Sequence, residues 1–115
     1  MSSDKEDCWF AVRCVFASGW PPDRSTPVYE ERITLWLAAS AEDGIERAEA
    51  EALEYAGSIA ESPDAYLGIA QSYQLFDAPG DGAEVFSLMR SSALEPDEYL
   101  DTFFDTGTER KKAVE

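Results

Sequence analysis

The stretch CWFAVRCVFA, residues 8–17, decides the fold, because its side chains alternate between two chemically different sets. A period of two is typical of a β-strand that buries one face. The predicted inner face consists of Cys8, Phe10, Val12, Cys14 and Phe16, and the outer face of Trp9, Ala11, Arg13 and Val15. We therefore expect a central strand here and read the rest of the chain relative to it.

A second strand is predicted over residues 28–39, after a loop at residues 19–27 that contains three prolines. Its two faces are Ile33, Leu35 and Leu37 on one side, and Glu30, Arg32, Thr34 and Trp36 on the other. We assign the face with Trp36 to the outer side of the sheet, beside Trp9. Tyr66, Ala70 and Phe76 from later segments are assigned to the same face, which is then more apolar than a solvated face needs to be.

A long amphipathic helix is predicted to begin at Ser40, which with Asp43 resembles a capping box. Gly57 and the group Ser62, Pro63 and Asp64 mark its end. Its apolar positions recur at helical spacing. They are Ala41, Ile45, Ala48, Ala52, Tyr55, Ala56 and Ile59. Residues 40–61 contain seven acidic residues and one arginine, a net charge of −6.

Two more strands are predicted, over residues 65–77 and 83–90, joined by a turn at residues 78–82. Pro96 fits the first turn of a short second helix. The apolar residues of that helix, expected to dock near the sheet edge, are Tyr99, Leu100, Phe103 and Phe104. The predicted fold class is α+β: a four-stranded, mainly antiparallel sheet in the order ββαββα, with the long helix packed on one face.

The predicted organisation is one domain over residues 8–105. Residues 1–7 form a polar N-terminal arm, and residues 106–115 form a disordered tail. A length of 115 residues fits one domain with its own core. The polar start does not resemble a secretory signal, so we expect a cytoplasmic protein.

Composition excludes several function classes. The chain has no histidine, which removes Ser–His–Asp, Cys–His and His-ligated metal chemistry. Its formal net charge of −15 disfavours binding to nucleic acid or to an anionic membrane. Cys8 and Cys14 lie too far apart along one strand for a disulfide, so we expect two reduced thiols. No cofactor is predicted, and we expect a protein that is not an enzyme.

The acidic helix is the strongest surface feature, and it predicts a docking face for a basic partner, with Glu42, Glu46 and Glu49 as binding residues. Trp20, in the proline-rich loop, is the expected aromatic contact. Trp9 and Trp36 are the expected self-association residues. Solvation alone also explains an acidic helix face, and intramolecular cover also explains the apolar sheet face.

Six segments of the chain share a pattern with a known group of sequences. They are residues 9–12, 29–35, the acidic helix, 73–77, 82–87 and 94–100. Together they resemble a small bacterial family known as a domain of unknown function, over about residues 8–104. The family usually has Ser where Glu95 stands. The resemblance implies a bacterial cytoplasmic origin and supplies no catalytic residues.

The hypothesis that combines these observations is an acidic antitoxin or immunity-type protein that blocks a basic toxin enzyme. The link to immunity proteins is an analogy of size and charge. Two alternatives stay open at this point: a homo-oligomeric structural or accessory module that pairs through the Trp9/Trp36 face, and a carboxylate-based metal enzyme.

Overall fold

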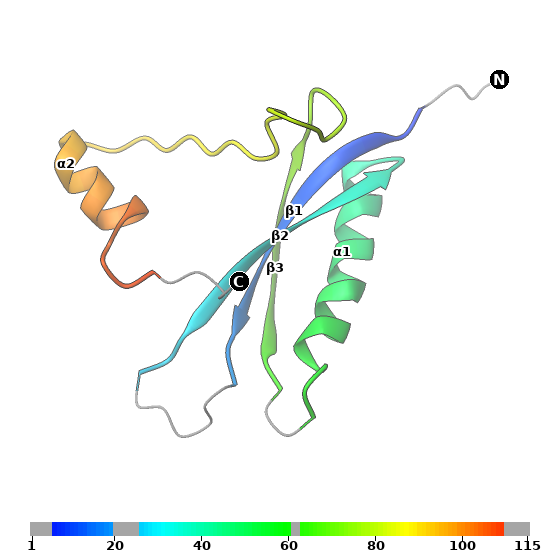
Figure 1. Cartoon of the computed structure of the whole chain (residues 1–115), viewed down its shortest axis with the longest axis horizontal. Helices are drawn as coiled ribbons and strands as arrows, with labels where there is room; N and C mark the ends of the chain where they lie inside the picture. The colour runs from blue at the N-terminus through cyan, green and yellow to red at the C-terminus, as the bar shows by residue number, and fades with distance from the viewer. Residues whose placement is uncertain (1–5, 20–25, 61–62, 110–115) are drawn as a thin grey trace.

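The centre of the molecule is a three-stranded antiparallel sheet with one long helix on one side (Figure 1). The computed structural model describes residues 6–19, 26–60 and 63–109. Strand β1 (Cys8–Ala17) is the middle strand, between β2 (Tyr29–Ala38) and β3 (Ala65–Gln74). The strand order β2-β1-β3 confirms the central position expected for residues 8–17.

The predicted four-stranded sheet in the order ββαββα is wrong, because residues 83–90 do not pair as a strand. The chain leaves β3 and turns through Gly82, whose φ of +81° lies in the left-handed region. It then runs away from the edge of β3 instead of back along it (Figure 1). The residue types of 83–90 are compatible with extended backbone, but they carry no information on whether a partner strand lies alongside.

Helix α1 (Ala41–Ala56) packs on the sheet through small residues, as its apolar pattern predicts. Gly44, Ala48, Ala52 and Ala56 are buried, and the last three pack with Val12, Cys14 and Phe16 of β1 in the core. Small side chains bring the helix close to the strands, so that the fully buried Phe16 fills the space between them. The Asp43 amide donates to Ser40 Oγ at 3.0 Å, which confirms the predicted N-cap.

The expected assignment of Trp36 to the outer face is wrong. In the antiparallel register Trp36 lies opposite Phe10, whereas Leu37 lies opposite Trp9. Residues directly opposite in a sheet share a face, so Trp36 is on the helix side with Phe10. Tyr66 and Ala70 also pack against the core beside α1, not with Trp9. Polar side chains of β2 can occupy the helix side because α1 supplies partners for them, as described below.

The face of the sheet opposite α1, here called the open face, therefore receives the aliphatic residues of β2. Leu35 lies opposite Ala11 of β1, which in turn lies opposite Tyr73 of β3. The exposed aliphatic side chains of β2 and β3 that we count with the open face are Ile33, Leu35, Leu37, Leu67 and Ile69. An antiparallel sheet with one solvated face usually carries polar residues there, so this composition needs an explanation.

Residues 83–104, here called the C-terminal arm, extend from the body of the molecule. The arm ends in α2 (Pro96–Tyr99) and a π-helical turn, η1 (Leu100–Phe104). Pro96 opens α2 as predicted, but the docking of these residues at the sheet edge is wrong. Among the described elements, α2 contacts η1 and no strand (Figure 1).

The dimensions of the chain agree with an extended arm. The radius of gyration is 17.0 Å, against roughly 13 Å for a compact chain of this length. Many apolar side chains of the arm are exposed. They are Val85, Leu88, Met89, Leu94, Leu100, Phe103 and Phe104.

Candidate protein-binding surfaces

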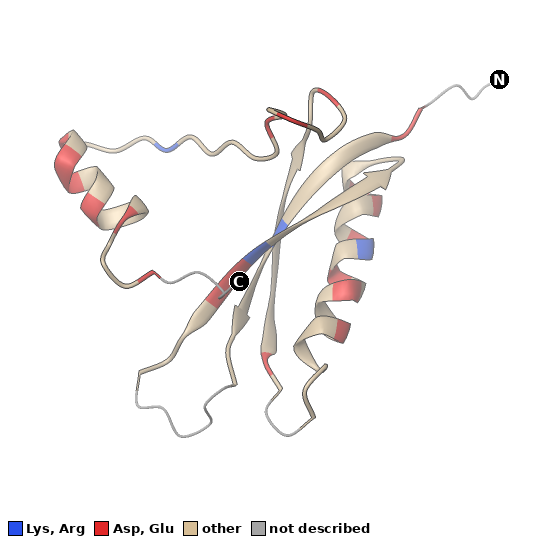
Figure 2. Cartoon of the chain, viewed as in Figure 1, with Lys and Arg blue, Asp and Glu red and all other residues tan. Residues whose placement is uncertain are grey.

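Acidic residues recur along α1 (Figure 2), and Glu42, Glu46 and Glu54 are exposed. Glu42 and Glu46 lie one helical turn apart and are both exposed. The structure therefore brings together two of the three acidic residues that the sequence predicts as partner-binding.

Glu49, the third, has a different environment. It is half-buried on the side of α1 that faces β3, where its Oε2 accepts a hydrogen bond from the Tyr66 hydroxyl at 2.5 Å. Burial is the main cause that raises the pKa of Tyr66 above its usual range, and this hydrogen bond is the second. The phenol therefore keeps its proton and stays a donor. Glu49 thus has a structural contact as well as a position at the border of the acidic surface. Trp20, the predicted aromatic contact, lies outside the described residues.

The opposite flank of α1 holds an ion pair that the sequence pattern did not reveal. Arg32 of β2 donates to both carboxylate oxygens of Glu51 at 2.8 and 2.9 Å. Its guanidinium also lies 3.8 Å from the centre of the Tyr55 ring. The hydrogen bond from Arg32 holds the pKa of Glu51 below its usual range. In the sequence, Arg32 lies on the same strand face as Trp36. This arginine could have indicated the ion pair only if that face of β2 had been assigned to the helix side.

Every arginine of the described residues makes an internal contact. Arg13 bonds Gln71 and lies 3.6 Å from a Glu31 oxygen, while Arg90 lies 4.1 Å from the centre of the Phe103 ring. Arg47, the one basic residue of α1, donates to the Leu37 carbonyl at 2.8 Å and lies over the Trp36 ring. Each of these guanidinium groups therefore already has a partner within the chain, and acidic residues outnumber the single arginine of α1.

The two predicted self-association residues lie on opposite faces of the sheet. Trp9 is on the open face and half-buried, opposite Leu37. Trp36 is on the helix side, where its indole N–H donates to Thr34 Oγ1 at 2.7 Å. The structure does not bring them together. Leu35 and its aliphatic neighbours occupy the place on the open face that the sequence pattern gave to Trp36.

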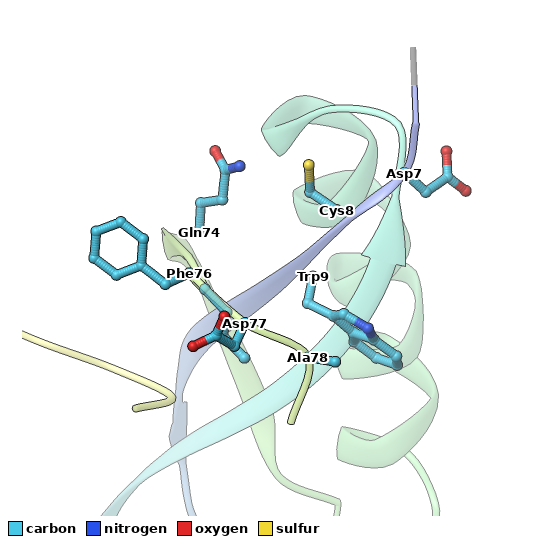
Figure 3. A pocket seen from close by; sticks show the side chains of 8 residues that line it. Asp7, Cys8, Trp9, Gln74, Phe76, Asp77 and Ala78 are labelled. Atoms are coloured by element: carbon cyan, nitrogen blue, oxygen red, sulfur yellow. The ribbon is translucent and has the colours of Figure 1, made fainter. Parts of the chain in front are cut away.

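A shallow depression of about 220 Å³ lies where β1 begins and β3 ends (Figure 3). Asp7, Cys8 and Trp9 line it from one side, and residues 74–78 from the other. The Asp7 and Asp77 side chains point away from each other, so they do not form a carboxylate pair (Figure 3). Among the described residues no group of three or more possible metal ligands comes together.

Both cysteines are free thiols on the helix side of β1. Cys14 is buried in the core, and this burial raises the pKa of its thiol. A protonated, buried thiol is a poor nucleophile, so Cys14 acts as a small core residue. Cys8 is half-buried beside the depression.

The described segments contain no helix that combines the length and the apolar character needed to cross a membrane. The resemblance to a bacterial family of unknown function stays a prediction. Comparison of the chain with protein-family models, with curated proteins and with solved structures finds no match in any of the three.

Proposed function

We propose that this chain is a non-catalytic, acidic protein-binding module that docks on a basic protein through the outer side of α1. The observation that carries the proposal is the position of the charges on this helix. Glu42 and Glu46 face solvent, while the exposed Arg47 donates to the Leu37 carbonyl and lies over the Trp36 ring. The helix therefore offers an incoming protein several carboxylates against one arginine, whose guanidinium already has contacts within the chain.

The whole-chain charge strengthens this effect. A net charge of −15 creates a negative potential around the molecule, and a basic partner would be drawn in over several ångströms before contact. Complementary charge of this kind acts mainly on the rate of association and on partner choice. An inhibitor that must capture a toxin enzyme quickly benefits from both effects. The finer proposal is therefore an antitoxin or immunity-type inhibitor in the bacterial cytoplasm, with Glu42 and Glu46 at its interface.

The test begins with affinity capture from the native cell, using the full chain as bait, followed by binding kinetics with each purified partner. The expected partner is basic, and its association rate falls steeply as salt rises. The double substitution Glu42→Lys and Glu46→Lys is expected to slow association by about tenfold or more.

The matched control changes the same amount of charge elsewhere. Asp97→Lys with Asp101→Lys alters two exposed carboxylates of the C-terminal arm and leaves α1 unchanged. The helix variant should slow association much more than the arm variant. Equal effects of the two variants would remove the assignment to α1, and a partner bound equally well at low and high salt would remove the electrostatic mechanism.

A further inference from the structure

The open face and the C-terminal arm both expose apolar side chains that the rest of the described chain does not cover. Leu35, near the middle of the face, is 38 % exposed, and Met89 and Phe104 of the arm are 92 % and 74 % exposed. Figure 1 shows α1 and the arm on opposite sides of the sheet, with the arm extending away from the strands. Apolar surfaces of this kind mark interaction sites on folded proteins.

The extended part of the arm, before α2, makes few backbone hydrogen bonds. Within the described residues, no backbone–backbone hydrogen bond involves residues 84–94. The α2–η1 segment spans only nine residues, too few for a stable isolated helix in water. Arg90, earlier in the arm, bonds the Tyr99 hydroxyl at 2.8 Å and lies over Phe103. An arm of this kind gains stability when another surface covers it.

One contact fixes the start of the arm on its own sheet. Phe86 lies 5.9 Å from Tyr73, measured between ring centres, and 5.2 Å from the guanidinium of Arg13. Tyr73 and Arg13 both belong to the open face, so the arm leaves the molecule from this side. Beyond Phe86 the arm is therefore placed to reach a molecule that sits against the open face.

We propose that this molecule is a second copy of the chain. In the resulting homodimer the open faces of the two copies approach each other, and the arm of each copy packs on the open face of its partner. Each copy then buries its open face and its arm, and one two-fold axis relates the two copies. This arrangement closes at two copies and leaves neither surface free to recruit a third.

Charge selects the open face over the rest of the surface for this contact. Two copies with a net charge of −15 each repel one another at most orientations. The charged groups at the centre of the open face are Arg13 and Glu31, which pair with each other. The acidic outer side of α1 lies on the opposite side of the sheet. The centres of two open faces therefore meet with little net charge.

The available area is also sufficient. The exposed aliphatic and aromatic side chains of the open face and the arm together offer on the order of 700 Å² per copy, taking ~100 Å² for an aliphatic side chain and ~200 Å² for a phenylalanine. A stable protein–protein interface buries about 800 Å² on each partner, polar and backbone atoms included. The apolar area that these side chains expose is thus close to the area that a specific dimer buries on each copy.

The first experiment measures the mass of the full chain by light scattering at high micromolar concentration. A mass of twice 12.7 kDa is expected, and higher salt should strengthen the association because it screens like-charge repulsion. This salt response is opposite to the one expected for a basic partner, so the two proposals fail independently. A monomer at all concentrations would overturn the dimer.

Substitutions locate the interface. Leu35→Lys on the open face and Phe104→Asp on the arm are each expected to raise the dissociation constant of the dimer at least about 100-fold, as an unpaired charge must then be buried. The matched control is Leu53→Lys, which places the same charge on an exposed leucine of α1. The control should remain a dimer. Leu35→Ser is a milder second variant, and far-UV circular dichroism verifies that each variant is folded.

A mixing experiment tests whether the arms cross between copies. When the Leu35→Lys and Phe104→Asp chains are mixed, one intact arm still meets one intact open face. Mixed dimers should therefore form at concentrations where each variant alone is a monomer. Failure of the mixture to associate would overturn the exchange of arms, and dissociation by Leu53→Lys would place the interface on α1 instead.

Discussion

Arg32 and Glu51 form a two-pronged ion pair between β2 and α1, with nitrogen–oxygen distances of 2.8 and 2.9 Å. The pair joins the edge strand to the helix, with both side chains about a quarter to a third exposed. Planar pairing of guanidinium and carboxylate is among the stronger polar contacts in proteins. It explains why an arginine can occupy the helix side of a strand.

The first prediction concerns Glu51→Gln and the acid stability of the fold. The folded pKa of Glu51 is lowered by Arg32, so its contribution is present above the carboxyl's ordinary pKa and is lost as pH falls through the folded value. At neutral pH the substitution should reduce the free energy of unfolding by about 1–2 kcal/mol. Urea titrations at pH 7 and pH 3 should show that this difference shrinks in acid.

The control for Glu51 lies on the same helix. Glu54→Gln removes an exposed carboxylate and should change stability by less than about 0.5 kcal/mol. Equal effects of the two substitutions at pH 7 would show that the ion pair contributes no more than a surface charge.

The second prediction is that Gly44→Ala stabilises the protein. The new Cβ would lie 3.5 Å from Phe10 Cβ, an ordinary contact distance, so it fits without displacing the ring. Alanine is favoured over glycine inside a helix by about 1 kcal/mol. Thermal unfolding should show a rise in the free energy of unfolding of about 0.5–1 kcal/mol.

Ala48→Gly is the reverse substitution one turn along α1. Ala48 is buried against the core, so glycine there should cost about 1 kcal/mol or more. A loss of stability in Gly44→Ala would mean that the helix and β1 are closer than the structure shows.

The third prediction concerns Gly68, where β3 departs from regular pairing with β1. The register shifts between Cys14 and Phe16, and Gly68 on the opposite strand has a φ of +83°. Gly68→Ala should cost about 1–2 kcal/mol, because a Cβ disfavours this backbone conformation even in open space. Gly80→Ala is the matched control, with equal space around it and no positive φ, and chemical denaturation should separate the two.

The fourth prediction compares the two thiols. Cys14 should react with iodoacetamide far more slowly than Cys8, because it is buried and its pKa is raised. As the pH rises, the Cys14 thiol loses its proton in the unfolded chain before it does so in the folded protein. The contribution of Cys14 to the free energy of unfolding therefore declines above about pH 8.5. Mass spectrometry of the alkylated protein at several pH values measures both rates. Equal rates would show that the core around Cys14 opens readily.

The sequence predicted local structure well where one periodic pattern dominates. The bounds of β1, the Ser40 cap and the end of α1 at Gly57 agree with the structure, because each depends on neighbouring residues. The pattern of β2 was also correct, but its facing was inverted. A hydropathy count ranks the face with Ile33, Leu35 and Leu37 as the more apolar one, yet α1 lies on the other face, where the partner of Arg32 is 19 positions away.

For the candidate sites, the sequence identified the acidic helix but not the destination of each charge. Glu42 and Glu46 face solvent as expected, whereas Glu49 bonds Tyr66 and Arg47 donates to the Leu37 carbonyl. Which carboxylates are available to a partner depends on contacts with residues far away in sequence, and these exist only in the folded chain.

By itself, the sequence determined the central strand, the capped acidic helix, the negative charge and the absence of histidine chemistry, since these follow from residue types and short-range spacing. Only the tertiary structure decided that residues 83–90 have no partner strand and that Leu35, not Trp36, lies on the open face. Pairing and facing are long-range choices. They depend on the free energy of the whole packed arrangement, and the extended backbone of a single segment is compatible with several such arrangements.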